Sequence, residues 1–138
     1  MHLQRLLQVM WFMDVLIVEP NELVGSMLFD ALDAEGISAA ILPDDAALEL
    51  RHAEPPRVVI TSMNRGHNED LKGHTLVSAM RRKWPAVCAV YLAALWPAHL
   101  PRRALAAGER FLSKPVQLDA MIRTVRELLS SGICRQQS

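Results

Sequence analysis

Five short apolar runs constrain the fold of this chain more than any other feature. They cover residues 13–18, 37–42, 57–61, 86–92 and 111–113. Short runs that do not alternate with polar residues are typical of strands buried on both faces of a sheet. Such strands need helices on both sides, so we expect a parallel sheet with helical crossovers.

Helical patterns separate these runs. Apolar residues recur at helical spacing in three segments, whose stripes are Leu23, Val24, Met27, Leu28 and Leu32; Leu76, Val77 and Met80; and Leu118, Met121, Ile122, Val125, Leu128 and Leu129. Two shorter helices are expected over 44–51 and 100–107. Strands and helices therefore alternate along the chain, as in an α/β protein.

Composition excludes several classes of protein. The chain has 138 residues, 51% of them hydrophobic, and a formal net charge of +0, which fits one compact soluble domain and argues against a general nucleic-acid binder. The longest apolar stretch falls short of the ~18 residues that a membrane span requires. Cys88 and Cys134 predict no disulfide framework, so we expect reduced thiols and a cytoplasmic protein.

Three segments make up the expected organisation. Residues 13–130 form the folded domain, and residues 131–138 form a C-terminal tail. The first twelve residues have two interpretations: an amphipathic helix, or an extension that precedes an alternative start at Met13.

Lys114 and Pro115 follow the fifth apolar run. A lysine at the end of a strand, before a proline that stops the ladder, places a cation at the carboxyl edge of the sheet, where open α/β folds bind ligands. Together with the order of elements and the acid Glu19 after the first run, this resembles the receiver domain of two-component response regulators. The resemblance implies a flavodoxin-like, doubly wound parallel sheet of five strands in the order 2-1-3-4-5, with helices on both faces.

The resemblance also implies a phosphorylation site, which this chain matches poorly. In the family, two acids after the first strand help to hold Mg²⁺, and an aspartate ending the third strand takes a phosphoryl group from a histidine kinase. Here those positions fall on Glu19 and Pro20, and on Ser62. The Thr or Ser that ends the fourth strand in the family becomes Leu92.

Two further positions follow the family more closely. Lys114 matches the lysine after the fifth strand, and Phe111 stands at the position of an aromatic switch residue. Lys114 also has a simpler interpretation as the ion-pair partner of Glu19, which we favour over ligand binding. Phe111 is likewise expected to be a packed aromatic residue rather than a moving switch.

The departures predict that the phosphorylation chemistry is lost. Phosphoryl transfer of this kind needs a carboxylate nucleophile and a Mg²⁺ ion held by acidic oxygens. Ser62 would need a neighbouring base, and none is evident near it in the sequence. His67 and Asp70 lie on the loop that follows and could approach it, but such loop side chains are more often solvated. We therefore expect no metal, no cofactor and no enzymatic activity. His67, His74 and His99 lack metal-ligand spacing, and the basic cluster 81–83 is expected to be a solvated helix face.

An apolar loop after the fourth run indicates an interface. Residues 92–98 are apolar where the family has a polar loop, and Leu95 and Trp96 lie within it. Exposed aromatic residues often anchor protein contacts, so we expect a partner, either a signalling protein or histidine kinase or a second copy of the chain. The alternative is that Trp96 folds back over Leu92 and Lys114 as part of the core.

The sequence thus predicts an atypical, stand-alone receiver domain of bacterial two-component signalling. It would act as a phosphorylation-independent interaction module with protein partners, not nucleic acid or membrane. Two alternatives remain open: a receiver that responds to a phosphorelay by unusual chemistry, and a small flavodoxin-like enzyme or binder of phosphate or nucleotide. No glycine-rich fingerprint follows Val18, which argues against the last one.

Overall fold

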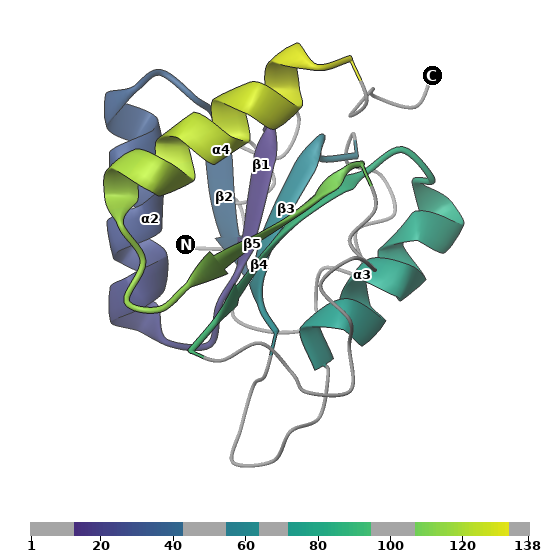
Figure 1. The fold of residues 1–138 in the computed structure, drawn as a ribbon, viewed down its shortest axis with the longest axis horizontal. Coiled ribbons are helices and arrows are strands. Elements are labelled where there is room, and N and C mark those ends of the chain that lie inside the picture. The colour runs from purple at the N-terminus through teal and green to yellow at the C-terminus, as the bar shows by residue number, and fades with distance from the viewer. Residues whose placement is uncertain (1–12, 43–54, 64–71, 95–106, 133–138) are drawn as a thin grey trace, which may run out of the picture.

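A five-stranded parallel sheet with helices on both faces forms the domain (Figure 1). The structure is a computed structural model, and it describes residues 13–42, 55–63, 72–94 and 107–132. The strand order is β2-β1-β3-β4-β5, which confirms the expected flavodoxin-like topology. The strands are β1 (Val15–Val18), β2 (Ala39–Leu42), β3 (Val58–Ser62), β4 (Cys88–Ala93) and β5 (Glu109–Ser113). The helices are α2 (Glu22–Ala34), α3 (Lys72–Lys83) and α4 (Leu118–Ser130).

Each face of the sheet has its own apolar core. Helices α2 and α4 cover one face, where Val15 and Ile17 of β1 pack with residues of both helices. Helix α3 covers the other face, where Leu16 and Val18 pack with Met80 and its neighbours. Because successive side chains of a strand point to opposite faces, a strand that serves both cores must be apolar throughout. This explains the uninterrupted runs in the sequence.

The ends of the helices follow their local sequence. The Asn21 side chain accepts a hydrogen bond from the backbone N–H of Val24, which caps the start of α2. Gly36, with φ of 74°, follows the end of this helix in the left-handed conformation that glycine adopts without strain. Helix α3 ends at Lys83, just before Trp84 and Pro85, as expected.

The strand boundaries differ from those expected. β3 extends to Ser62, β4 extends to Ala93, and β5 begins at Glu109 rather than at Phe111. In each case a strand keeps its backbone pairing beyond the apolar run, as Ala89 and Glu109 do between β4 and β5. Hydropathy alone does not locate such ends, because the neighbouring strand supplies the hydrogen bonds.

Several predictions concern residues outside the described ranges. These are the helices expected over 44–51 and 100–107, the extension 1–12, and the loop that contains Leu95 and Trp96. The expectation of reduced thiols is wrong for Cys88, which is disulfide-bonded in the structure. Sequence separation carries no information on which cysteines meet in space. No described helix has the length and apolar character needed to cross a membrane.

Candidate functional site

Three strands bring Glu19, Ser62 and Lys114 together at the carboxyl edge of the sheet. Glu19 follows β1, Ser62 ends β3, and Lys114 follows β5. The Ser62 hydroxyl donates a hydrogen bond to Oε2 of Glu19. The ammonium group of Lys114 donates to Oγ of Ser62 at 3.0 Å and lies 4.0 Å from Oε2 of Glu19. The contact between Lys114 and Glu19 is the one expected from the sequence.

The buried polar atoms of this site satisfy one another. Glu19 and Ser62 are 4% and 1% exposed, whereas the side chain of Lys114 is 34% exposed. The second carboxylate oxygen of Glu19, Oε1, accepts the backbone N–H of Asn21 at 3.1 Å. Removing a carboxylate from water is costly unless partners compensate. Both oxygens of Glu19 have such partners, so the ion pair and its hydrogen bonds form a self-contained unit.

The base that the sequence lacks around Ser62 is supplied by the fold. Glu19 lies 43 positions before Ser62 in the chain, yet its carboxylate accepts a hydrogen bond from the Ser62 hydroxyl. β1 and β3 are neighbours with Val18 opposite Thr61, so Glu19, which follows β1, meets Ser62, the last residue of β3. The fold thus brings a carboxylate to Ser62 that is not near it in the sequence. The strand order expected from the resemblance already pairs β1 with β3, and so predicts that Glu19 lies close to Ser62.

Helix α3 begins directly against Ser62. The backbone N–H of Gly73 donates to the carbonyl of Met63 at 3.1 Å. A Cβ atom at Gly73 would lie 2.1 Å from the carbonyl oxygen of Ser62, far inside van der Waals contact. Only glycine allows the helix to sit so close to the end of β3. The sequence analysis did not identify this residue.

The other positions that the resemblance matches to a phosphorylation site carry no side-chain oxygen ligand or hydroxyl group in this chain. Pro20 is exposed and offers no side-chain oxygen. Leu92 pairs with Ser62 across β3 and β4, is fully buried, and packs in the core beneath α2 and α4. Phe111 is half-buried and packs against the core beneath α3. The place of the family's hydroxyl is thus filled by a packed leucine.

These residues do not fit a Mg²⁺ ion. The ion demands several oxygen ligands in octahedral geometry. Glu19 supplies one carboxylate whose two oxygens already accept hydrogen bonds, and Pro20 supplies none. Within the described residues, no group of three His, Cys, Asp or Glu side chains could hold a metal ion.

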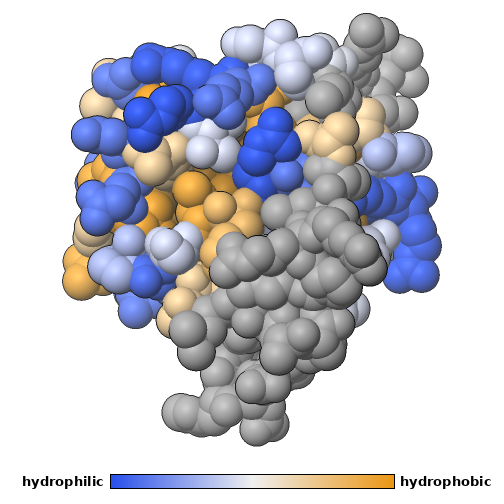
Figure 2. All heavy atoms as spheres, viewed as in Figure 1, coloured by the Kyte–Doolittle hydropathy of each residue, from blue (hydrophilic) through white to orange (hydrophobic). Residues whose placement is uncertain are grey.

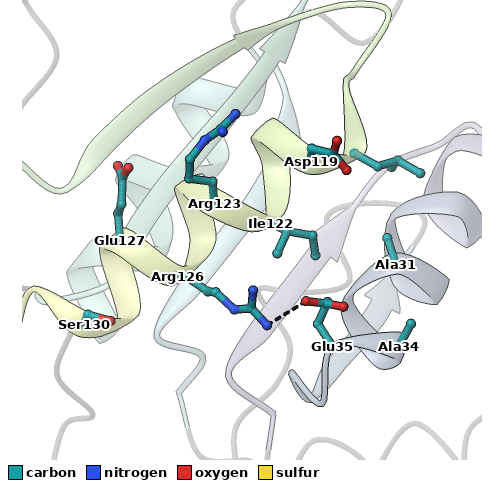
Figure 3. A pocket seen from close by; sticks show the side chains of 10 residues that line it. Ala31, Ala34, Glu35, Asp119, Ile122, Arg123, Arg126, Glu127 and Ser130 are labelled. Carbon is teal, nitrogen blue, oxygen red and sulfur yellow. Dashed lines mark hydrogen bonds and ion pairs between the residues drawn. The ribbon is translucent and has the colours of Figure 1, made fainter.

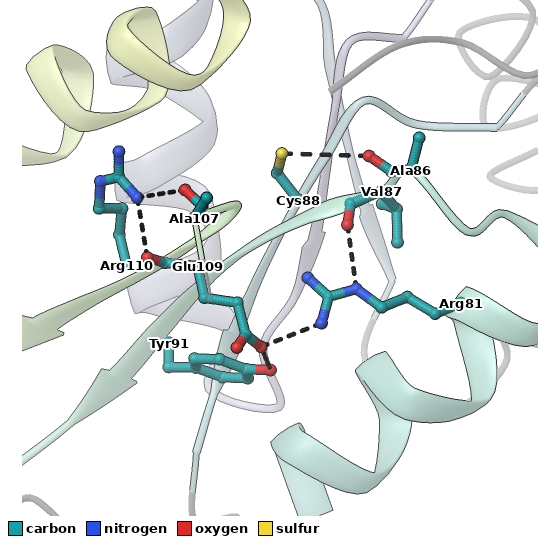
Figure 4. Close-up of polar contacts among 8 residues, drawn as sticks. All are labelled: Arg81, Ala86, Val87, Cys88, Tyr91, Ala107, Glu109 and Arg110. Atoms are coloured by element: carbon teal, nitrogen blue, oxygen red, sulfur yellow. Dashed lines mark hydrogen bonds and ion pairs between the residues drawn. The ribbon is translucent and has the colours of Figure 1, made fainter. Parts of the chain in front are cut away.

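A second polar cluster links α3 to β4 and β5 (Figure 4). The Tyr91 hydroxyl donates to Oε2 of Glu109 at 2.6 Å, and Arg81 lies 3.1 Å from the same oxygen. Burial and the contact with Glu109 raise the pKa of Tyr91 far above the ordinary value of 10.0. Arg81 also donates to the carbonyl of Val87. The expectation of a solvated basic face is therefore wrong for Arg81, because its guanidinium group pairs with the buried carboxylate of Glu109 in β5.

Comparison with known proteins supports the fold. No family model and no curated protein matches this sequence. The receiver domain of the Francisella response regulator 1452 is similar in structure, with 21% identity, a TM-score of 0.70, and coverage of 86% of this chain and 97% of that one. The fold is that of a receiver domain.

Further solved structures agree with this result. The chemotaxis protein CheY4 of Vibrio cholerae has 18% identity and a TM-score of 0.68, covering 85% of this chain and 98% of its own. The receiver domain of the hybrid histidine kinase CckA has 19% identity and a TM-score of 0.65, covering 84% and 98%. At such identities the likeness establishes the architecture, and the receiver fold places Ser62 at the end of its third strand.

Proposed function

We propose that this chain is an atypical receiver domain of bacterial two-component signalling that acts as a protein-interaction module without phosphorylation. The observation that carries the proposal is the contact set of Ser62. Its hydroxyl stands where the receiver fold ends the third strand, and it lies between the carboxylate of Glu19 and the ammonium of Lys114. The cation that would meet a phosphoryl group is already neutralised from within the protein.

The surroundings of Ser62 support the same proposal. A neutral hydroxyl replaces the carboxylate nucleophile, Pro20 offers no metal ligand, and Leu92 offers no hydroxyl for a phosphoryl oxygen. Each loss alone weakens phosphoryl transfer, and together they remove the nucleophile, the metal and the coupling hydrogen bond. The domain therefore holds one state at this edge of the sheet, and its signal is the binding of a partner.

Incubation with acetyl phosphate and Mg²⁺ tests the proposal. We expect intact mass spectrometry to show no acyl phosphate, while a receiver domain that retains its aspartate gains about 80 Da in the same experiment. A stoichiometric adduct that hydroxylamine removes would contradict the proposal, because it would show that another carboxylate of this chain accepts phosphate.

The contact between Ser62 and Glu19 favours a second candidate, in which the receiver responds by unusual chemistry. A serine with a carboxylate base at its hydroxyl and a lysine beside it has the components of an activated nucleophile. The product would be a phosphate ester of Ser62, which hydroxylamine does not remove. Its formation in the wild type and its absence in Glu19→Gln would favour this candidate. The 1% exposure of Ser62 argues against it.

We also propose that the apolar segment 95–98, which follows β4 in the sequence, binds a partner. Leu95 and Trp96 lie there, outside the described residues. We expect Trp96→Ala to weaken capture of a signalling protein or kinase from the native host, with little change in melting temperature. A loss of several kcal/mol of stability with unchanged capture would instead make Trp96 a core residue.

A further inference from the structure

A disulfide-bonded cysteine lies at the amino edge of the sheet, the edge opposite to Ser62. Cys88 begins β4, is 1% exposed, and packs in the core beneath α2 and α4 (Figure 4). Its sulfur is part of a disulfide in the structure. The sequence contains one other cysteine, Cys134, so Cys134 is the bonding partner that a single chain can offer.

A hydrogen bond brings the end of α4 to the same edge. Nη2 of Arg57 donates to the carbonyl of Leu129 at 2.6 Å, and thereby satisfies a carbonyl that the last turn of a helix leaves without an intrahelical partner. Helix α4 has no basic residue of its own in that turn. The carbonyl of Arg57 in turn accepts the backbone N–H of Cys88 at 2.9 Å. Arg57 therefore connects the end of α4 to the start of β4 (Figure 1).

The segment between these points is short. Gly132 follows the end of α4 with φ of 78°, a left-handed conformation that ends the helical path of the chain. Cys134 comes five positions after Leu129 in the sequence, and five residues span at most roughly 17 Å. Neighbouring strands lie about 4.8 Å apart, and Cys88 starts the strand next to the one that Arg57 precedes. The described residues therefore leave Cys134 within reach of Cys88 in the same chain.

The rest of α4 is held to the domain by other contacts. Its apolar stripe packs on the core, and hydrophilic residues cover its outer side (Figure 2). Arg126 pairs with Glu35 at 2.7 Å and so joins α4 to α2 across the groove between the two helices (Figure 3). Loss of the disulfide should therefore loosen the end of α4 and leave the body of the helix in place.

We propose that Cys88 and Cys134 form a reversible disulfide that acts as a redox switch on the C-terminal end of the domain. Oxidation fastens the tail to the amino edge of the sheet, and reduction removes this covalent link while the fold persists. Disulfides in the cytoplasm, where we expect this chain to act, are usually transient and redox-sensing. The switch is independent of the function proposed for Ser62, because that residue lies at the opposite edge of the sheet.

Exchange with glutathione supplies the chemistry of the switch. The thiolate of one cysteine attacks a sulfur of oxidised glutathione, forms a mixed disulfide and releases one glutathione thiolate. The thiolate of the second cysteine then attacks the sulfur of the first, closes the bond between Cys88 and Cys134, and releases the second glutathione. The two cysteines thereby lose two electrons and two protons, and glutathione disulfide is reduced to two thiols. Reduction runs through the same steps in reverse.

Alkylation and intact mass spectrometry of the full chain test whether the bond is reversible. After equilibration with oxidised glutathione, the denatured wild type should take up no N-ethylmaleimide, and after millimolar reduced glutathione it should take up two molecules. A bond that survives millimolar reduced glutathione would be structural and would overturn the proposal. So would thiols that stay free in oxidised glutathione, or a bond between two chains, which a non-reducing gel reveals.

Hydrogen exchange tests whether the bond controls the end of α4. We expect the amides of residues 125–132 to exchange about tenfold faster in the reduced wild type than in the oxidised one, because the link no longer opposes local opening. The melting temperature should fall by roughly 10 °C on reduction. Cys134→Ser is the matched control, because it changes the polar tail and keeps the buried Cys88; it should exchange at the reduced rate in both forms of glutathione. Equal exchange in the oxidised and reduced wild type would contradict the switch.

Discussion

Whether residue 62 is a serine or an aspartate determines the chemistry of the whole site. Its hydroxyl donates to Glu19 and accepts from Lys114, so it bridges an anion and a cation. An aspartate in its place would put two carboxylates side by side, and Lys114 alone would have to neutralise both. Like charges at such distances oppose each other's ionisation. With a serine at position 62, Lys114 has only the carboxylate of Glu19 to neutralise at this site.

Restoring the nucleophile alone should not restore phosphorylation. We expect Ser62→Asp to take up phosphate from acetyl phosphate slowly or not at all, because Pro20 still supplies no metal ligand and Leu92 no hydroxyl. The triple variant Ser62→Asp, Pro20→Asp, Leu92→Thr should be faster. The measurement is the rate of uptake by intact mass spectrometry, and equal rates would mean that the nucleophile was the only defect.

At the scale of elements, the position of α3 depends on two contacts at its opposite ends. Gly73 lets its first turn sit against the carbonyl of Ser62. Arg81 in its last turn reaches Glu109 at the start of β5, where Tyr91 of β4 also donates. Helix α3 is thus fixed to β3 at one end and to β4 and β5 at the other.

Gly73→Ala should destabilise the domain. Alanine ordinarily favours a helix over glycine by about 1 kcal/mol, but here its Cβ meets the backbone of Ser62 at 2.1 Å. We expect a loss of about 1–3 kcal/mol, as for other overpacked sites. Urea unfolding measures it, with the exposed Ser78→Ala on the same helix as control. A more stable Gly73→Ala variant would show that α3 does not start where the structure places it.

Tyr91 should resist titration and add a pH dependence to stability. Its raised pKa means that the folded state favours the neutral phenol, so the contribution is complete below pH 10 and is lost as pH rises above the unfolded value. Tyr91 is the single tyrosine of the chain, so tyrosinate absorbance reports on it directly.

Tyr91→Phe provides the comparison. Near neutral pH it should cost about 1–2 kcal/mol, because buried Glu109 loses a hydrogen bond, and this difference should shrink in alkali. Ionisation of Tyr91 at its ordinary pKa in the folded protein would mean that it is not held by Glu109.

At the scale of the whole molecule, the domain keeps the receiver architecture with a site that does not fit the metal. A Mg²⁺ site filled at 100 times its dissociation constant would stabilise the fold by about 2.7 kcal/mol. For a domain of this size that equals a rise in melting temperature of roughly 10 °C. We expect calorimetry with millimolar Mg²⁺ to show almost no rise. A large rise with Mg²⁺ but not with Ca²⁺ would reveal a binding site that Glu19 and its neighbours do not suggest.

The sequence by itself determined the architecture. Uninterrupted apolar runs such as 13–18 predict strands buried on both faces, and stripes such as Met121, Val125 and Leu128 predict the covering helices. These patterns are local, because the spacing of apolar residues along a short segment is enough to show which face of a strand or helix is buried. The positions of Glu19, Ser62 and Lys114 at one edge follow from that architecture together with the family's topology.

Only the tertiary structure decided what those residues do. Which atom of Glu19 meets the Ser62 hydroxyl, why Gly73 must be a glycine, and why Arg81 turns toward Glu109 all depend on contacts between segments far apart in the chain. Hydrogen bonds and close packing require distances defined to a fraction of an ångström, and hydropathy patterns carry no such information. The pattern of residues therefore predicts the fold, whereas the chemistry at the carboxyl edge of the sheet depends on how strands β1, β3 and β5 come together.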